Sequence, residues 1–226
     1  MSHDNSIRKG VTRQKLDELH AAAKGDRWRF VAMAPRLAMG LLRGKSLMEM
    51  ISSDAMNECF IPISPMQGEF LYVTARSLDA KNIVEFGTSF GISTIYLAAA
   101  LKDSGGGRVI STELEPNKCK KARENLKQAG VAEYAEIREG DAMETLADLS
   151  EPVDLVLLDG WKDLYLPVLE LIKPNLRPGS IILADNIFTF RKSLRPYVEH
   201  MQSGENGFSS TTLDIADGFE YSVYLG

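Results

Sequence analysis

The sequence predicts an α/β protein built on a doubly wound, mostly parallel sheet of seven strands, with a helical extension at the N-terminus. From residue 83 onward, apolar runs of strand length alternate with segments of helical periodicity, which favours parallel strands covered by helices on both faces. Residues 1–60 show helical patterns only. The last two strand-like segments follow one another without a helix, so the last strand should pair antiparallel.

The extension at residues 1–60 is expected to form three helices, at residues 11–24, 27–43 and 46–57. Arginine recurs at heptad spacing along the second helix, at Arg29, Arg36 and Arg43. We interpret this face as solvated or as packing onto the domain or a second subunit, and attraction to an acidic substrate or membrane surface is the alternative. Because the region over residues 27–57 is apolar, we expect a homodimer, with the extension acting as a lid or a dimer arm.

The main domain is expected to span residues 61–226. Its strands are predicted at residues 83–86, 108–112, 135–138, 153–158, 180–184, 211–215 and 220–224. Its helices are predicted at residues 66–78, 92–101, 116–129, 142–149, 164–176 and 191–201. Pro116 suits the first turn of a helix and Gly130 suits its end. The pattern therefore indicates one α/β domain with an extension rather than two domains.

Composition narrows the class of protein. With 226 residues, 44% hydrophobic and 25% charged, the chain is typical of a soluble globular protein. A formal charge of −5 argues against a nucleic-acid binder, which would more often be basic. Two cysteines, Cys59 and Cys119, cannot form a disulfide framework, and no apolar signal core or membrane-spanning run is present. We therefore expect a cytoplasmic protein with no stable membrane insertion.

Acidic residues lie at or near the ends of the first five predicted strands: Glu85, Glu113, Asp141, Asp159 and Asp185. In an open parallel sheet, ligands bind outside the carboxyl ends of the strands, so we expect these acids to surround one cleft. For each of them the alternative is a helix N-cap, and for Asp141 this alternative is as good as a binding role.

Two of these strand ends predict a metal site. The apolar run at residues 155–158 stops at Asp159, and the run at residues 180–184 stops at Asp185 and Asn186. Carboxylate and amide oxygens are ligands that Mg²⁺, Mn²⁺ or Ca²⁺ prefers. Lys162 follows Asp159 by three residues and is expected to lie above the metal as a base.

The turn after the first strand predicts a nucleoside site without a polyphosphate. A dinucleotide-binding turn would place glycines at positions 87, 89 and 92, where this chain has Gly87, Ser89 and Ile92, and no P-loop lysine is present. Glu113, at the end of the second strand, suits ribose hydroxyls, and Asp141 could accept from an adenine amino group. This set suits S-adenosylmethionine, and the expected cofactor-binding residues are Glu85, Gly87, Thr88, Ser89, Gly91, Ser93, Glu113, Asp141 and Ala142.

Three segments resemble a known family. The turn at residues 85–93 is similar to the first motif of class I methyltransferases. The segments Leu158-Asp-Gly-Trp-Lys-Asp-Leu-Tyr-Leu-Pro167 and Leu183-Ala-Asp-Asn-Ile187 closely resemble catechol O-methyltransferase and its cation-dependent relatives. The tail at residues 218–224 resembles that family's last strand. The resemblance covers about residues 60–226 and implies a Rossmann-like fold.

This resemblance implies a mechanism. Asp159, Asp185 and Asn186 would hold one Mg²⁺, and the two adjacent hydroxyls of a catechol-like ring would complete its coordination. Lys162 would act as general base, and Glu220 would hydrogen-bond the second hydroxyl. Trp161, together with Asp159, would line the cofactor. The alternatives are a solvated edge-strand position for Glu220 and core packing for Trp161.

Other functions are weighed against this one. A different phenolic acceptor, such as a polyketide-like phenol or a hydroxycinnamoyl thioester, would keep the same fold and cofactor. A nicotinamide-dependent oxidoreductase is disfavoured by the missing glycines at positions 89 and 92. A non-catalytic nucleoside-binding protein is disfavoured by the intact set of Asp159, Lys162, Asp185 and Asn186.

Overall fold

The structure is a computed structural model, which describes residues 5–23 and 63–226. Several expectations lie outside the described residues. They concern the helices at residues 27–43 and 46–57, the arginine face, and the apolar region from which we expected a dimer. The first expected helix begins at Gly10. Its buried Leu16 and Leu19 join the core of the main domain, and the Ser6 hydroxyl donates to Asp103 at 2.6 Å.

The sheet has seven strands in the order β3-β2-β1-β4-β5-β7-β6. Their bounds are β1 Asn82–Phe86, β2 Arg108–Glu113, β3 Ala135–Glu139, β4 Val153–Leu158, β5 Leu176–Ala184, β6 Phe208–Leu213 and β7 Phe219–Tyr224. Strands β1 to β5 pair parallel, whereas β7 pairs antiparallel with both β5 and β6. The predicted mixed, doubly wound sheet is therefore confirmed. The strand order reverses between β1 and β4, where such sheets bind their ligands.

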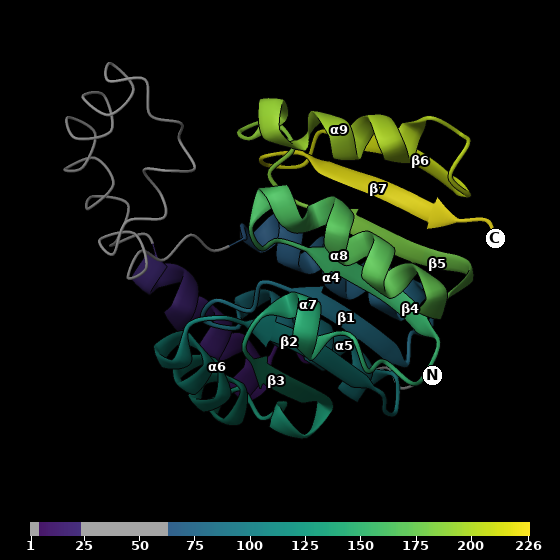
Figure 1. Ribbon diagram of the computed structural model, residues 1–226. Coiled ribbons are helices and arrows are strands. Elements are labelled where there is room, and N and C mark those ends of the chain that lie inside the picture. Colours follow the sequence, from purple (N-terminus) through teal and green to yellow (C-terminus); the bar gives the residue numbers. More distant parts are fainter. Residues whose placement is uncertain (1–4, 24–62) are drawn as a thin grey trace, which may run out of the picture.

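Helices cover both faces of the sheet (Figure 1). One face carries α4 (Pro65–Ser77), α5 (Ile92–Asp103), α6 (Pro116–Gln128) and the helix at residues 10–23, and the other carries α7 (Ala142–Thr145), α8 (Tyr165–Ile172) and α9 (Arg191–Gln202). Successive residues of a strand face opposite cores, as Leu155 and Val156 do. Every residue of β4 is buried, including Asp154, and this burial explains the apolar run at residues 155–158.

Several predicted boundaries are wrong for local reasons. The helix expected over residues 164–176 is limited to α8, because Pro174 lies in a 3₁₀ turn at Lys173–Asn175 and cannot continue an α-helix. The helix expected over residues 142–149 ends at Thr145, whose hydroxyl donates to the carbonyl of Asp141 and competes with helical bonding.

Two strands start earlier than expected. Strand β5 begins at Leu176, which pairs with Val153. Pro178 and Gly179 interrupt the apolar run, and the register shifts between Val153 and Leu155, but pairing with β4 resumes at Ile181. Strand β6 begins at Phe208, a buried residue paired with Tyr224, and ends before the expected residue 215. Within the described residues, no helix has both the length and the apolar character needed to cross a membrane.

Candidate active site

The ends of β1 and β4 meet through backbone contact at Gly87. The Asp159 amide donates to the Phe86 carbonyl at 2.8 Å, which ties the two strand ends together. Gly87 has φ of +104°, and a Cβ there would lie 2.7 Å from the carbonyl carbon of Asp159. Only glycine combines this conformation with so close an approach. The turn after β1 and the turn carrying Asp159 are thus held against each other.

Asp159 and Asp185 form the acidic centre of this region. Asp185 follows β5, and its amide donates to the Leu158 carbonyl at 3.0 Å, beside Asp159. Burial raises the pKa of Asp159, against the opposing effect of Lys162, and Asp217 adds to the rise. Burial, followed by the charge of Asp159, raises the pKa of Asp185 well above its usual range. Both acids would therefore be easier to ionise beside an added cation.

Lys162 points into this centre from a 3₁₀ turn at Lys162–Leu164. Its side chain is buried, and Nζ lies 3.3 Å from Asp159 Oδ1 and 2.8 Å from the Tyr165 hydroxyl. The Tyr165 hydroxyl in turn donates to the Asp185 backbone carbonyl at 3.1 Å. Nζ also lies 5.5 Å from the centroid of the Phe190 ring. The amine is thus held beside both acids rather than in solvent.

The three expected metal ligands each keep one oxygen free of hydrogen bonds within the described part of the chain. Asp159 Oδ1 accepts from Lys162. Asp185 Oδ1 accepts from Gln67 Nε2 and the Asn186 amide, both at 2.7 Å. Asn186, in the left-handed conformation at φ +66°, donates Nδ2 to Asp217 at 3.4 Å. One oxygen from each residue remains, and three single oxygen donors fit a hard divalent cation.

A metal held by carboxylates alone is not supported. Within residues 5–23 and 63–226, no group of three or more His, Cys, Asp or Glu side chains could hold an ion. The expected set has two carboxylates, and the amide oxygen of Asn186 supplies the third donor. The set therefore fits Mg²⁺ or Mn²⁺ coordination with open positions for other oxygen ligands.

Glu113 organises the turn after β1. Ser89, at φ +49°, donates its amide to Glu113 Oε2 at 2.8 Å, and the Glu115 amide donates to Oε1 at 3.0 Å. Gly91, at φ +83°, precedes α5 and approaches Ala122 of α6. The carboxylate is only partly buried, so it remains open to the ribose hydroxyls that we expected it to bind.

Glu85 lies inside β1 and is fully buried, so it does not border an open cleft as expected. Its Oε2 accepts from the hydroxyls of Thr94 and Ser111, and Ser93 also bonds this carboxylate. Thr88 is buried against Ser111. Burial raises the pKa of Glu85 to about 7. Among the described residues Oε1 has no partner, so the carboxylate has a free acceptor suited to a cationic ammonium group.

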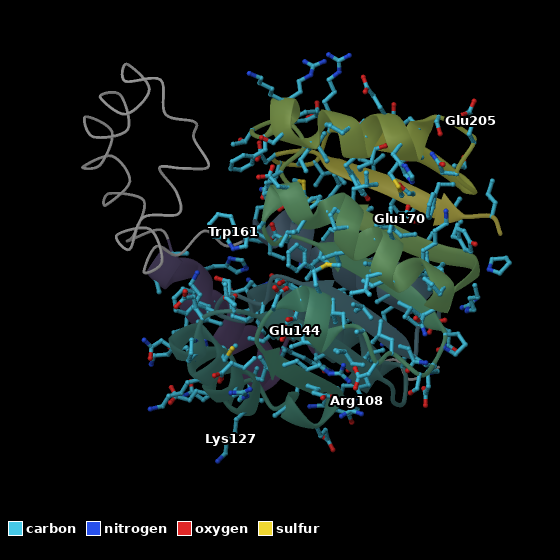
Figure 2. All side chains as sticks on the ribbon, viewed as in Figure 1. Arg108, Lys127, Glu144, Trp161, Glu170 and Glu205 are labelled. Atoms are coloured by element: carbon cyan, nitrogen blue, oxygen red, sulfur yellow. The ribbon has the colours of Figure 1, made fainter. Side chains whose placement is uncertain are left out.

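The remaining expected cofactor-binding residues, Asp141, Ala142 and Trp161, differ in burial and in local structure. Asp141 is the N-cap of α7, accepting from the Met143 amide at 2.8 Å, and Ala142 is the buried first residue of that helix. Trp161 is not core packing, because 37% of its surface is exposed. Figure 2 shows it at the end of the sheet where the parallel strands finish.

Glu220 is not the solvated edge-strand residue that was the alternative to an acceptor-binding role. It lies in β7, which is not an edge strand, and it is fully buried. Oε1 accepts from Gln202 Nε2 at 2.8 Å and from the Ser210 hydroxyl, and Oε2 accepts from the Thr212 hydroxyl. Glu220 is paired with Ala184, next to Asp185 in sequence. Binding an acceptor hydroxyl would compete with these three donors.

Three residues at this centre were missed by sequence reasoning: Gln67, Tyr165 and Asp217. Gln67 is part of a capping box with Ser64, a pattern visible in the sequence, but its bond to Asp185 spans 118 positions. Tyr165 follows Lys162 by three residues, the spacing of neighbours on a helix face. Asp217 stands in the turn before β7, and no local signal connects it to Asn186.

The sequence of this chain is similar to those of methyltransferases. Residues 84–187 match a family model described as a methyltransferase domain. A catechol O-methyltransferase of Niastella koreensis is 38% identical over 138 residues, covering 59% of this chain and 62% of the relative. A catechol O-methyltransferase of Mycobacterium tuberculosis is 36% identical over 137 residues, covering 60% of this chain and 61% of the relative. The matches thus span about three fifths of the length of these curated relatives.

Solved structures agree. The O-methyltransferase of Bacillus cereus, crystallised with SAH, is 28% identical with a TM-score of 0.68, and the match covers 85% of this chain and 97% of that one. The similarity in structure therefore extends beyond the segment at residues 84–187 that the family model matches.

Proposed function

We propose that this chain is a class I S-adenosylmethionine-dependent O-methyltransferase similar to catechol O-methyltransferase, and that it methylates one hydroxyl of a small catechol-like molecule with the aid of a divalent cation. The observation that carries this proposal is the arrangement of Lys162 beside Asp159 and Asp185, with Asn186 completing the donor set. An isolated nucleoside-binding protein would have no need of an amine buried between two acids.

The cofactor would lie across the ends of β1, β2 and β4. Glu113 would accept hydrogen bonds from the ribose hydroxyls, and the free oxygen of Glu85 would face the cationic amino group. The exposed ring of Trp161 would cover the cofactor, with Asp141 and Ala142 toward the adenine. The left-handed Gly87 lets the backbone approach the ligand closely.

Asp159, Asp185 and Asn186 would hold the cation, preferably Mg²⁺ or Mn²⁺, through the oxygens that the protein leaves unbonded. When bound, S-adenosylmethionine supplies an electrophilic methyl group, and a divalent cation lowers the pKa of a coordinated hydroxyl. The contribution of the protein is alignment and charge placement. Gln67 keeps one oxygen of Asp185 turned away from the ligand position.

Lys162 would accept the proton of the reacting hydroxyl at Nζ. Its bonds to Asp159 and the Tyr165 hydroxyl restrict the amine to one position, as a general base requires. We retain Glu220 as a second, weaker candidate for orienting the other hydroxyl. It would first have to release donors such as Gln202.

The acceptor class is supported by exposed apolar side chains next to the site residues. Met66, Trp161 and Phe188 are 66%, 37% and 46% exposed. Each is within two positions of a residue that contacts the acidic centre, respectively Gln67, Lys162 and Asn186. We propose that these side chains border the acceptor position, where they would suit a flat aromatic ring with adjacent hydroxyls.

The test is methyl transfer from S-adenosylmethionine to a simple catechol with Mg²⁺, then with EDTA. We expect activity that EDTA abolishes and excess Mg²⁺ restores. Activity indifferent to EDTA would remove the cation from the proposal. Cofactor binding without transfer to catechol would point to another acceptor, which a panel of polyketide-like phenols and hydroxycinnamoyl thioesters would identify.

A further inference from the structure

Asp217 lies in the turn between β6 and β7, and this turn is bonded to the segment that follows β5. The Phe188 amide donates to the Asp217 carbonyl at 2.9 Å, and the Ile187 amide donates to the Gly218 carbonyl at 3.2 Å. The Asp217 side chain adds two bonds, from the Thr189 hydroxyl at 2.8 Å and from Asn186 Nδ2 at 3.4 Å. The loop at residues 186–189 is therefore held by the turn at residues 217–218, and Asp217 accepts three of these four bonds.

From this arrangement we infer that Asp217 is a positioning residue for divalent-cation binding, which orients the amide of Asn186 and adds negative charge without ligating the cation. The inference rests on the proposed metal site. Asp217 is neither one of the proposed metal ligands, which are Asp159, Asp185 and Asn186, nor the proposed base, Lys162.

The orientation argument follows from hydrogen-bond polarity. An amide can approach a carboxylate only with its NH₂ group, because its oxygen would be repelled. By accepting from Nδ2, Asp217 leaves Oδ1 of Asn186 as the atom available to a cation. Asn186 sits at φ +66°, and its backbone amide donates to Asp185 Oδ1 at 2.7 Å. Without Asp217, the amide could rotate and present its NH₂ group instead.

The charge argument is independent of the orientation argument. The carboxylates of Asp159, Asp185 and Asp217 interact electrostatically, and among the described residues Lys162 forms an ion pair with Asp159. The negative charge of Asp217 adds to the potential that would attract a divalent cation to the donor set. Both oxygens of Asp217 already accept bonds from the loop, so it contributes charge at a distance. Residues that hydrogen-bond a metal ligand without binding the metal typically change metal affinity by about 10- to 100-fold.

The experiment measures Mn²⁺ binding by loss of the free-ion electron paramagnetic resonance signal, in the full-length protein without substrate. We expect Asp217→Asn to weaken Mn²⁺ binding by about 10- to 100-fold. Asp217→Glu, which keeps the charge, should bind more tightly than Asp217→Asn. The matched control is Asp214→Asn, which removes the same charge from an exposed position in the same turn and should bind like the wild type.

S-adenosylmethionine affinity, measured calorimetrically without metal, distinguishes a specific effect on metal binding from a general loss of folding. We expect Asp217→Asn to retain the S-adenosylmethionine affinity of the wild type. If it is lost together with Mn²⁺ binding, Asp217 serves folding and the inference is overturned. Equal Mn²⁺ affinity in wild type and Asp217→Asn also overturns it. Absence of Mn²⁺ binding in the wild type overturns the metal site of the proposed function itself.

Discussion

At the residue scale, the proposed chemistry depends on the position of Lys162. Its amine bonds to Asp159 and to Tyr165, whose hydroxyl reaches the backbone of Asp185. Two side chains, those of Lys162 and Tyr165, thus connect the two strand ends that carry the acids. The sequence shows the spacing between Asp159 and Lys162, but the link through Tyr165 is a property of the folded chain.

Replacing Lys162 by alanine tests the base role. We expect kcat for catechol methylation to fall by about 10²- to 10⁴-fold, the usual contribution of a positioned general base, with S-adenosylmethionine affinity unchanged. Steady-state kinetics and calorimetry measure the two quantities. The control is Lys127→Ala, which changes an exposed lysine that projects from α6 (Figure 2). An unchanged kcat for Lys162→Ala would contradict the role.

Glu85 gives a prediction about pH. Burial raises its pKa from 4.5 to about 7 in the folded protein, so between these values the folded state binds more protons than the unfolded state. The free energy of unfolding should therefore decrease as pH rises through this window, by about 3 kcal/mol for this group at about 1.36 kcal/mol per pKa unit. Glu85→Gln should lack this decrease.

Urea unfolding of the cofactor-free protein at several pH values between 4.5 and 8 measures the effect of Glu85. Glu144→Gln is the control, since Glu144 is an exposed carboxylate in α7 (Figure 2) and should keep the wild-type profile. Parallel pH profiles for wild type and Glu85→Gln would show that the buried carboxylate does not titrate as inferred.

At the scale of elements, the site depends on two close junctions between turns. One joins the turn after β1 to the end of β4 at Gly87, and the other joins the loop after β5 to the turn before β7 at Gly218. A Cβ at Gly218 would lie 2.9 Å from the Phe188 ring. Both junctions involve segments far apart in sequence, so the positions of the proposed ligand-binding residues depend on correct strand order.

Gly87→Ala should damage the first junction. The added Cβ meets the backbone of Asp159, which cannot move without displacing the acid, so we expect loss of S-adenosylmethionine binding and reduced thermal stability. Gly105→Ala is the matched control: it also has positive φ, at +83°, but no atom lies within 4 Å of its Cβ. The control should lose about 1–2 kcal/mol through backbone strain alone and keep cofactor affinity. Similar affinities in the two variants would contradict the junction's role.

At the scale of the whole molecule, the cofactor should stabilise the fold because its proposed site joins several strand ends. At about 100 times its dissociation constant, a ligand adds about 2.7 kcal/mol to the free energy of unfolding. For a chain of this size we expect S-adenosylmethionine to raise Tm by about 5–10 °C. Differential scanning fluorimetry measures this, with NAD⁺ as the comparison. A shift with NAD⁺ alone would favour the oxidoreductase alternative.

Much of the fold could be predicted from the sequence because its evidence is local. Apolar runs such as residues 155–158 predict buried strands, and the absence of a helix between the last two strands predicts their antiparallel pairing. Errors occurred where local signals were misleading: Pro178 and Gly179 lie within β5, and α7 ends at Thr145. Pairing across the sheet, rather than local preference, decides such boundaries.

The sequence by itself determined the fold class and brought Asp159, Lys162, Asp185 and Asn186 to attention, because strand ends and their spacing are written in consecutive residues. Tertiary structure alone decided that Gln67 and Asp217 hold two of these residues, and that Glu220 is buried among polar side chains. Such contacts join segments that are distant along the chain. They depend on strand order, register and the packing of helices over the sheet, which no local pattern specifies.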